Sequence, residues 1–116
     1  MSVKAVIFDL DGTITQPYLD FDAIREEMGF ARAAGPILEL MQTMTSDEHR
    51  RAQGILAAHG RQAVEESTLS PGACETLDAI RRAGLPIGVV TRNLRENALA
   101  VAAKHGLLFD CVVGRE

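Results

Sequence analysis

The 116-residue sequence is poor in aromatic residues, with no Trp, one Tyr and four Phe. It also lacks an excess of positive charge, because its formal net charge is −4, and this disfavours a nucleic-acid partner. No apolar run approaches the roughly 18 residues of a membrane span. Asp9 and Asp11 interrupt the first apolar segment, which therefore does not fit a signal peptide. We expect a cytoplasmic protein with neither a nucleic-acid nor a membrane partner.

Cysteine is scarce as well. Cys74 and Cys111 are the two cysteines of the chain, too few for a disulfide framework or a zinc site. Cys111 lies in an apolar run, where we expect a buried thiol. The three histidines have no metal-ligand spacing. The sequence therefore predicts neither a disulfide framework nor a metal site built from cysteine and histidine.

Three short apolar runs are rich in strand-forming residues and predict a β-sheet. They cover residues 3–10, 86–90 and 109–113. The first run would be apolar on both faces of a strand, apart from Lys4 and Asp9, as in a parallel strand that is covered on both sides. A length of 116 residues predicts one domain, with room for a small inserted subdomain.

Helical patterns separate these runs. Ser70 and Pro71 predict the start of a helix that ends at Gly84. Asn93 with Glu96 resembles a capping box at the start of the next helix. Alternating strands and helices predict an α/β fold with a doubly wound parallel sheet.

Residues 17–69 show helical patterns without a strand. We expect one helix to end at Gly29, a second to begin at Pro36, and a third to be capped by Thr45 with Glu48. These helices predict an inserted cap over residues 17–69. The core then comprises residues 1–16 and 70–116.

Two carboxylates, Asp9 and Asp11, stand at the end of the first predicted strand. Residues two apart in an extended chain point to the same side, so both can reach one site. An isolated D-x-D pattern is more often a solvated turn or a helix cap. Here it leaves a strand predicted to be buried, at the end where doubly wound folds bind ligands. Two close carboxylates need a cation, and Mg²⁺ suits oxygen ligands beside phosphate.

The second candidate element is Thr91-Arg92-Asn93, between the second strand and the following helix. Unpaired N–H groups at a helix start attract a phosphate oxygen, and the Thr91 hydroxyl adds a donor. A plain strand-to-helix turn capped by Asn93 is the competing interpretation of this segment. Gly12 suits the sharp turn after the first strand.

Four features together resemble the haloacid dehalogenase superfamily, in particular its phosphoglycolate phosphatase-like members. They are the string FDLDGT at residues 8–13, the helical insert, SPGA at residues 70–73 and VVTRN at residues 89–93. The resemblance covers essentially the whole chain. It implies a Rossmann-like parallel core with an inserted helical cap, and a small phosphorylated metabolite as substrate.

The resemblance also implies a mechanism. Asp9 would attack phosphorus and form an aspartyl-phosphate, while Asp11 would act as acid and then as base. Mg²⁺ would bind a carboxylate oxygen of Asp9, the backbone carbonyl of Asp11 and the substrate phosphate. The substrate phosphate would be held by five residues: Leu10, Gly12, Thr91, Arg92 and Asn93.

The sequence departs from the family pattern in two respects. Its lysines, Lys4 and Lys104, do not occupy the family's position beyond the third strand, and the later acidic metal ligands are missing. We therefore expect a C-terminally truncated chain whose first strand has an open edge, through which it would self-associate. A catalytically incomplete fragment that binds a phosphorylated ligand or a partner, and a phosphomutase, remain alternatives. A dehalogenase fits less well, since Asp11 suits phosphoryl transfer.

Overall fold

The computed structural model describes residues 2–116. Three parallel strands form one sheet in the order β1-β2-β3, which confirms the predicted α/β class. The strands are β1 (Val6–Phe8), β2 (Ile87–Val90) and β3 (Cys111–Val113), and the helices are α1 (Phe21–Met28), α2 (Ile37–Met41), α3 (Ser46–Glu65), α4 (Ala73–Arg82) and α5 (Arg95–His105). Within residues 2–116, no helix is both long and apolar enough to cross a membrane.

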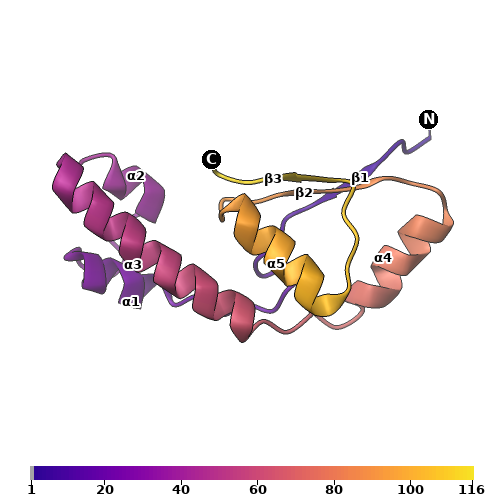
Figure 1. The fold of residues 1–116 in the computed structure, drawn as a ribbon, viewed down its shortest axis with the longest axis horizontal. Helices are drawn as coiled ribbons and strands as arrows, with labels where there is room; N and C mark the ends of the chain where they lie inside the picture. The colour runs from indigo at the N-terminus through magenta and orange to yellow at the C-terminus, as the bar shows by residue number, and fades with distance from the viewer. Residues whose placement is uncertain (1) are drawn as a thin grey trace. The chain divides into compact units, whose positions relative to one another are not determined.

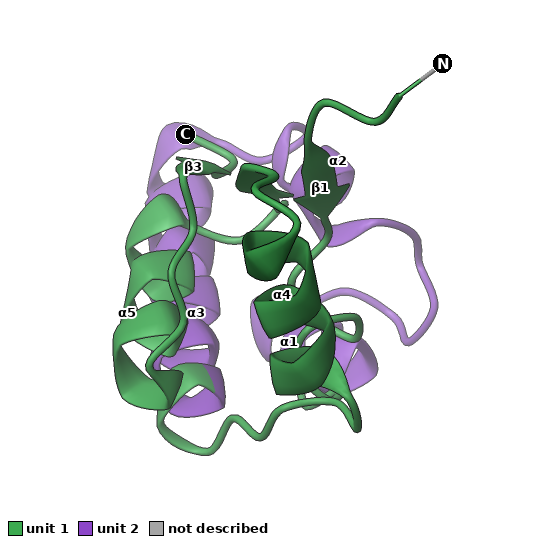
Figure 2. Cartoon of the chain, turned by 90° about the vertical axis from the view of Figure 1, so that its right-hand side faces the viewer, with its two compact units in different colours: residues 1–18, 64–116 green, residues 19–63 purple. Residues whose placement is uncertain are grey.

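The chain divides into two compact units, coloured separately in Figure 2. Unit 1 contains residues 1–18 and 64–116, and unit 2 contains residues 19–63. Residues 64–69 belong to unit 1 because Val64 and Leu69 pack against its apolar core. The Gln16 amide also donates to the Thr68 carbonyl at 2.9 Å. The compact part of the insert is therefore shorter than residues 17–69.

Both helices of the sheet region, α4 and α5, lie on the same side of the sheet (Figure 1). Two successive right-handed crossovers that step in one direction produce this arrangement. The face toward the helices carries Ile87, Val89 and Val112, which are all buried. Val89 pairs with Phe8 on one side and Val112 on the other, so this face forms the core of unit 1.

The opposite face of the sheet is exposed, so the expectation that the first strand is covered on both sides is wrong. Ile7 is 68% exposed, and Val90 and Val113 are about half exposed at 51% and 49%. Cys111 lies on the same face and is exposed, so the expected burial of its thiol is also wrong. The physical reason is that side chains alternate along a strand, and both crossovers cover one face alone.

Two predicted helix starts are also corrected. Gly72, with φ of 80°, precedes the first residue of α4, so Ser70 and Pro71 form a turn before the helix. This turn is closed by the Ala73 amide, which donates to the Ser70 carbonyl at 3.0 Å. The N-cap of α5 is Leu94, without a side-chain capping bond. Asn93 therefore lies one residue before the cap and its side chain bonds elsewhere.

Unit 2 follows its local sequence signals closely. The capping box is confirmed, since Thr45 N donates to Glu48 Oε1 at 2.9 Å and Glu48 N donates to Thr45 Oγ1 at 3.3 Å. Helix α1 begins after Asp20, which accepts from Ala23 N at 3.1 Å, and ends at Gly29 with φ of 97°. The core of the unit consists of Ile24, Met28, Ile37, Met41, Ala52 and Leu56.

Candidate functional site

The loop after β1 turns around one buried residue, Leu10. Its carbonyl accepts from the amides of Thr13, Ile14 and Thr15 at 3.1, 3.0 and 3.2 Å. The Leu10 side chain is fully buried, whereas both neighbouring acids are exposed. Gly12 permits the turn because its φ is 80°, a conformation that favours glycine. The burial of Leu10 thus leaves two carboxylates at the carboxyl end of β1.

The loop after β2 is organised by Thr91, which is buried. Its amide donates to the Val113 carbonyl at 2.9 Å, and its Oγ1 accepts from Asn93 N at 3.1 Å. The Thr91 hydroxyl therefore keeps its own proton available for a further acceptor. Arg92 follows and is exposed.

These two loops meet at one edge of the sheet. Because β1 and β2 are parallel neighbours, their carboxyl ends lie side by side. Asn93 Nδ2 donates to Asp11 Oδ2 at 3.3 Å. The structure therefore brings together Asp11, Thr91 and Asn93 from segments far apart in sequence. The Leu10 amide donates to Asp9 Oδ1 at 2.8 Å and so already has a partner.

The electrostatic environment singles out Asp11. Although Asp11 is exposed as a residue, partial desolvation of its carboxyl raises the pKa above the usual range. The hydrogen bond from Asn93 lowers the pKa, and the negative charge of Asp9 raises it. A raised pKa helps a carboxyl to hold a proton until it is needed, as a general acid must. The negative charge of Asp9 thus favours the protonated form of Asp11.

Three residues that the sequence reasoning did not select also belong to this edge. The buried Asn97 donates from Nδ2 to Asn93 Oδ1 at 2.9 Å. Glu116 Oε1 accepts from Arg95 N at the start of α5 at 2.9 Å, and Arg115 N donates to the Asn93 carbonyl at 3.0 Å. The four-residue spacing of Asn93 and Asn97 is a helical signal that could have indicated the first contact. No local signal indicates the other two.

The residues that could hold a metal at this edge are Asp9 and Asp11. Their exposed oxygens suit a hard cation such as Mg²⁺, which commonly combines one or two carboxylates with water and phosphate. Across the described residues 2–116, no group of three His, Cys, Asp or Glu side chains could hold a metal. The two acids therefore fit a cation that takes its other ligands from backbone carbonyls, water or a substrate.

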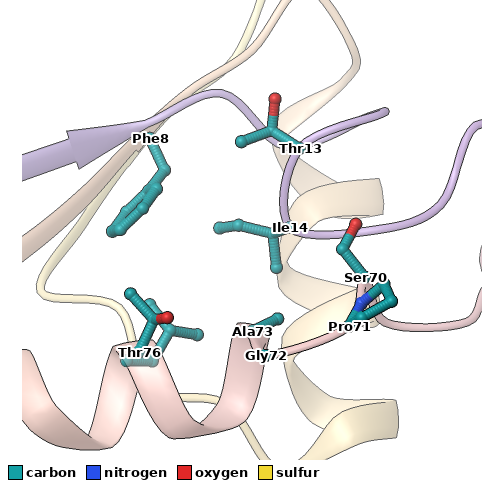
Figure 3. A pocket seen from close by; sticks show the side chains of 9 residues that line it. Phe8, Thr13, Ile14, Ser70, Pro71, Gly72, Ala73 and Thr76 are labelled. Carbon is teal, nitrogen blue, oxygen red and sulfur yellow. The ribbon is translucent and has the colours of Figure 1, made fainter.

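A separate pocket of about 140 Å³ lies between the end of β1 with its following loop and the first turns of α4 (Figure 3). Phe8 and Ile14 line it from one side, and Ala73 and Thr76 line it from α4. Its polar groups are neutral hydroxyls, since no charged side chain lines it. An anionic ligand is better served by the edge that carries Asp11, Thr91 and Asn93, where a cation can bind.

Open parallel α/β folds bind their ligands at the carboxyl ends of the strands, and the paired acids of this chain lie at that end of β1. Comparison with known proteins identifies the family. A model of haloacid dehalogenase-like hydrolases matches residues 3–116. The chain belongs to this family.

Individual relatives agree. A haloacid dehalogenase-like hydrolase domain-containing protein of Arabidopsis thaliana is 27% identical over 98% of this chain and 51% of its own. A phosphoglycolate phosphatase of Chromobacterium violaceum is 28% identical over 97% of this chain and 62% of its own. In fold, the chain resembles a predicted phosphoglycolate phosphatase from Haemophilus somnus, with a TM-score of 0.69 at 20% identity, over 97% of this chain and 63% of that one. The chain thus spans about half the length of the first curated relative and less than two thirds of the others.

Proposed function

We propose that this chain carries the reactive carboxylates of a phosphatase that hydrolyses a small phosphate monoester. Family membership supports hydrolase chemistry, and one of the relatives is named as a phosphoglycolate phosphatase. The observation that carries the proposal is the hydrogen bond from Asn93 to Asp11. It joins the carboxyl ends of two parallel strands, where the paired acids and the Thr91 hydroxyl can face one phosphate group.

The proposed reaction has two steps. In the first, a carboxylate oxygen of Asp9 attacks phosphorus, the bond from phosphorus to the ester oxygen breaks, and Asp11 gives its proton to the leaving alkoxide. In the second, Asp11 takes a proton from a water molecule as that water attacks the phosphorus of the aspartyl-phosphate. The bond from phosphorus to the Asp9 oxygen breaks, which releases inorganic phosphate and restores Asp9. The raised pKa of Asp11 suits the first of these proton transfers.

The phosphate would be held at the edge of the sheet by groups from both loops. The hydroxyl of Thr91 and the backbone at Gly12 and Arg92 are the proposed donors, with the Asn93 side chain beside them. The Leu10 amide is bonded to Asp9 in this structure and would serve the phosphate by exchanging this partner. Mg²⁺ held by the Asp9 carboxylate and the backbone carbonyl of Asp11 would offset the negative charge that develops during transfer.

The test is the turnover of an aryl phosphate such as p-nitrophenyl phosphate with Mg²⁺ present. Asp9→Asn should lower kcat by roughly a thousandfold or more, because an amide oxygen is a poor nucleophile. Asp78→Asn is a matched control, since Asp78 is an exposed acid on α4, and should leave kcat unchanged. Retained turnover in Asp9→Asn would exclude Asp9 as the nucleophile.

A second candidate function is the binding of a phosphorylated ligand without turnover. The lysine positions favour it, because Lys4 and Lys104 both precede β3 and neither occupies the family's lysine position. Calorimetric titration with inorganic phosphate and Mg²⁺ separates the two functions. Phosphate binding that depends on Mg²⁺, together with no turnover of the aryl phosphate, would favour the binding function.

A further inference from the structure

Helix α5 carries a polar side chain that is buried against the core. Asn97 is 5% exposed and is followed by Ala98, which is fully buried. A buried amide is costly unless its hydrogen-bonding groups have partners. The Nδ2 of Asn97 finds its partner in the side chain of Asn93, at 2.9 Å from Oδ1. The buried residue is therefore connected directly to the candidate site.

The contacts of Asn93 fix the orientation of its amide. Its Oδ1 accepts both from Leu94 N at 2.8 Å and from Asn97 Nδ2 at 2.9 Å. A carbonyl oxygen has two lone pairs, so these two donors use its accepting capacity. The NH₂ group must then point the other way, where it donates to Asp11 Oδ2 at 3.3 Å. If the amide were reversed, its NH₂ group would face the donors of Leu94 and Asn97, and its oxygen would face the Asp11 carboxylate.

We propose that Asn97 is a positioning residue that acts through Asn93 on Asp11, by holding the NH₂ group of Asn93 toward the Asp11 carboxylate. The proposal rests on the proposed function of Asp11 as acid and base. Without the Asn97 donor, the Asn93 amide keeps the Leu94 contact on its oxygen side and the 3.3 Å contact to Asp11 on its nitrogen side, so fewer bonds hold its orientation. Asp11 then loses a fixed neighbour, although Asn97 itself does not touch it.

Kinetics with the aryl phosphate test this role. Asn97→Leu, which keeps the size of the side chain and removes its donors, should lower kcat roughly tenfold while KM changes little. Asn97→Asp should lower kcat further, because an ionised carboxylate would repel the Asn93 oxygen. Ser67→Ala is the control: Ser67 is another buried polar residue of unit 1, bonded to Val64 and His105, and this variant should keep its kcat.

A double-mutant cycle distinguishes positioning from simple loss of packing. In an Asn93→Ala background, Asn97→Leu should lower kcat no further, since the effect passes through Asn93. A full and independent loss of kcat in that background would overturn the proposal. The proposal would also be overturned if Ser67→Ala, with a similar drop in melting temperature, lost as much kcat as Asn97→Leu. If Asn97→Asp does not fold, the cycle with Asn97→Leu decides.

A readout that does not need turnover separates this proposal from the proposed function. In a ¹⁵N-labelled protein, the Asn93 NH₂ signals are identified by their disappearance in Asn93→Ala. In Asn97→Leu they should move toward the position of a solvent-exposed amide and exchange faster. Unchanged signals would remove the positioning role even in an active enzyme. If the wild type does not turn over the aryl phosphate but the Asn93 signals still shift in Asn97→Leu, the proposed catalytic function is wrong and the positioning of Asn93 by Asn97 stands.

Discussion

Unit 2 and the candidate site of unit 1 are built from contacts of different range. In unit 2, polar contacts often join near neighbours, such as Asp22 with Arg25 at 3.0 Å and Thr45 with Glu48. At the site, the contact between Asn93 and Asp11 joins residues 82 positions apart. Local contacts follow from turn and cap chemistry that a sequence displays. Long-range contacts depend on which strands become neighbours, so they require the tertiary structure.

The largest expected loss of stability comes from truncating one buried core residue in each unit, which also tests whether the two units unfold separately. Leu10→Ala and Ile24→Ala each remove a fully buried side chain, and each should lower the free energy of unfolding by about 2–5 kcal/mol. Hydrogen exchange should show loss of protection in residues 64–116 for Leu10→Ala and in residues 19–63 for Ile24→Ala. Equal loss of protection throughout the chain in both variants would show that the two units unfold as one.

The next largest effect on stability concerns the side chain of Asp110, which links the start of β2 with the residue before β3. The Asp110 carboxylate accepts from Ile87 N at 2.7 Å and from Arg81 at 2.9 Å. The hydrogen bond from the Ile87 amide, with a smaller contribution from Arg81, lowers the pKa of Asp110.

A lowered folded-state pKa means that this carboxylate stabilises the fold above its ordinary pKa, and that the contribution disappears as the pH falls through the folded-state value. Asp110→Asn should therefore be less stable than the wild type near pH 7, with the difference shrinking toward pH 3. Urea unfolding at several pH values measures it. A difference that is independent of pH would contradict the assignment.

The smallest effects are local ones in unit 2. Thr45→Ala removes the capping oxygen of α3 and should cost about 1 kcal/mol, within the usual range for N-caps. Arg50→Ala is the control, because Arg50 and Asp47 are highly exposed, at 80% and 93%, and lie 3.7 Å apart. It should change stability by less than about 0.5 kcal/mol. Thermal unfolding of both variants gives the comparison, and equal shifts would exclude a specific role of the cap.

Much of the fold could be read from local patterns. The three apolar runs contain the three strands, and Gly29, Gly84 and Gly106 each follow a helix closely. The strand lengths could not be read, because pairing with β2 limits β1 to Val6–Phe8. The extra apolar residues before it, such as Val3, are exposed. Apolar character indicates that a segment can be buried, whereas the neighbouring elements decide whether it is.

The candidate site shows the same division. The positions of Asp9 and Asp11 after the first strand, and of Thr91 after the second, follow from the strand predictions. The prediction that Asn93 caps the helix is wrong, since α5 begins two residues later. The side-chain amide of Asn93 instead bonds Leu94, Asn97 and Asp11. A short polar residue before a helix can cap it or bond across to another loop. The competing partners are invisible in a local pattern.

By itself, the sequence determined the kinds of element, the caps of unit 2 and the acids that follow the first strand, because each depends on residues a few positions apart. The tertiary structure alone decided which face of the sheet is bare, how Glu116 meets the start of α5 and which way the Asn93 amide points. Those outcomes depend on strand order and on crossovers of fixed handedness, which place distant segments together.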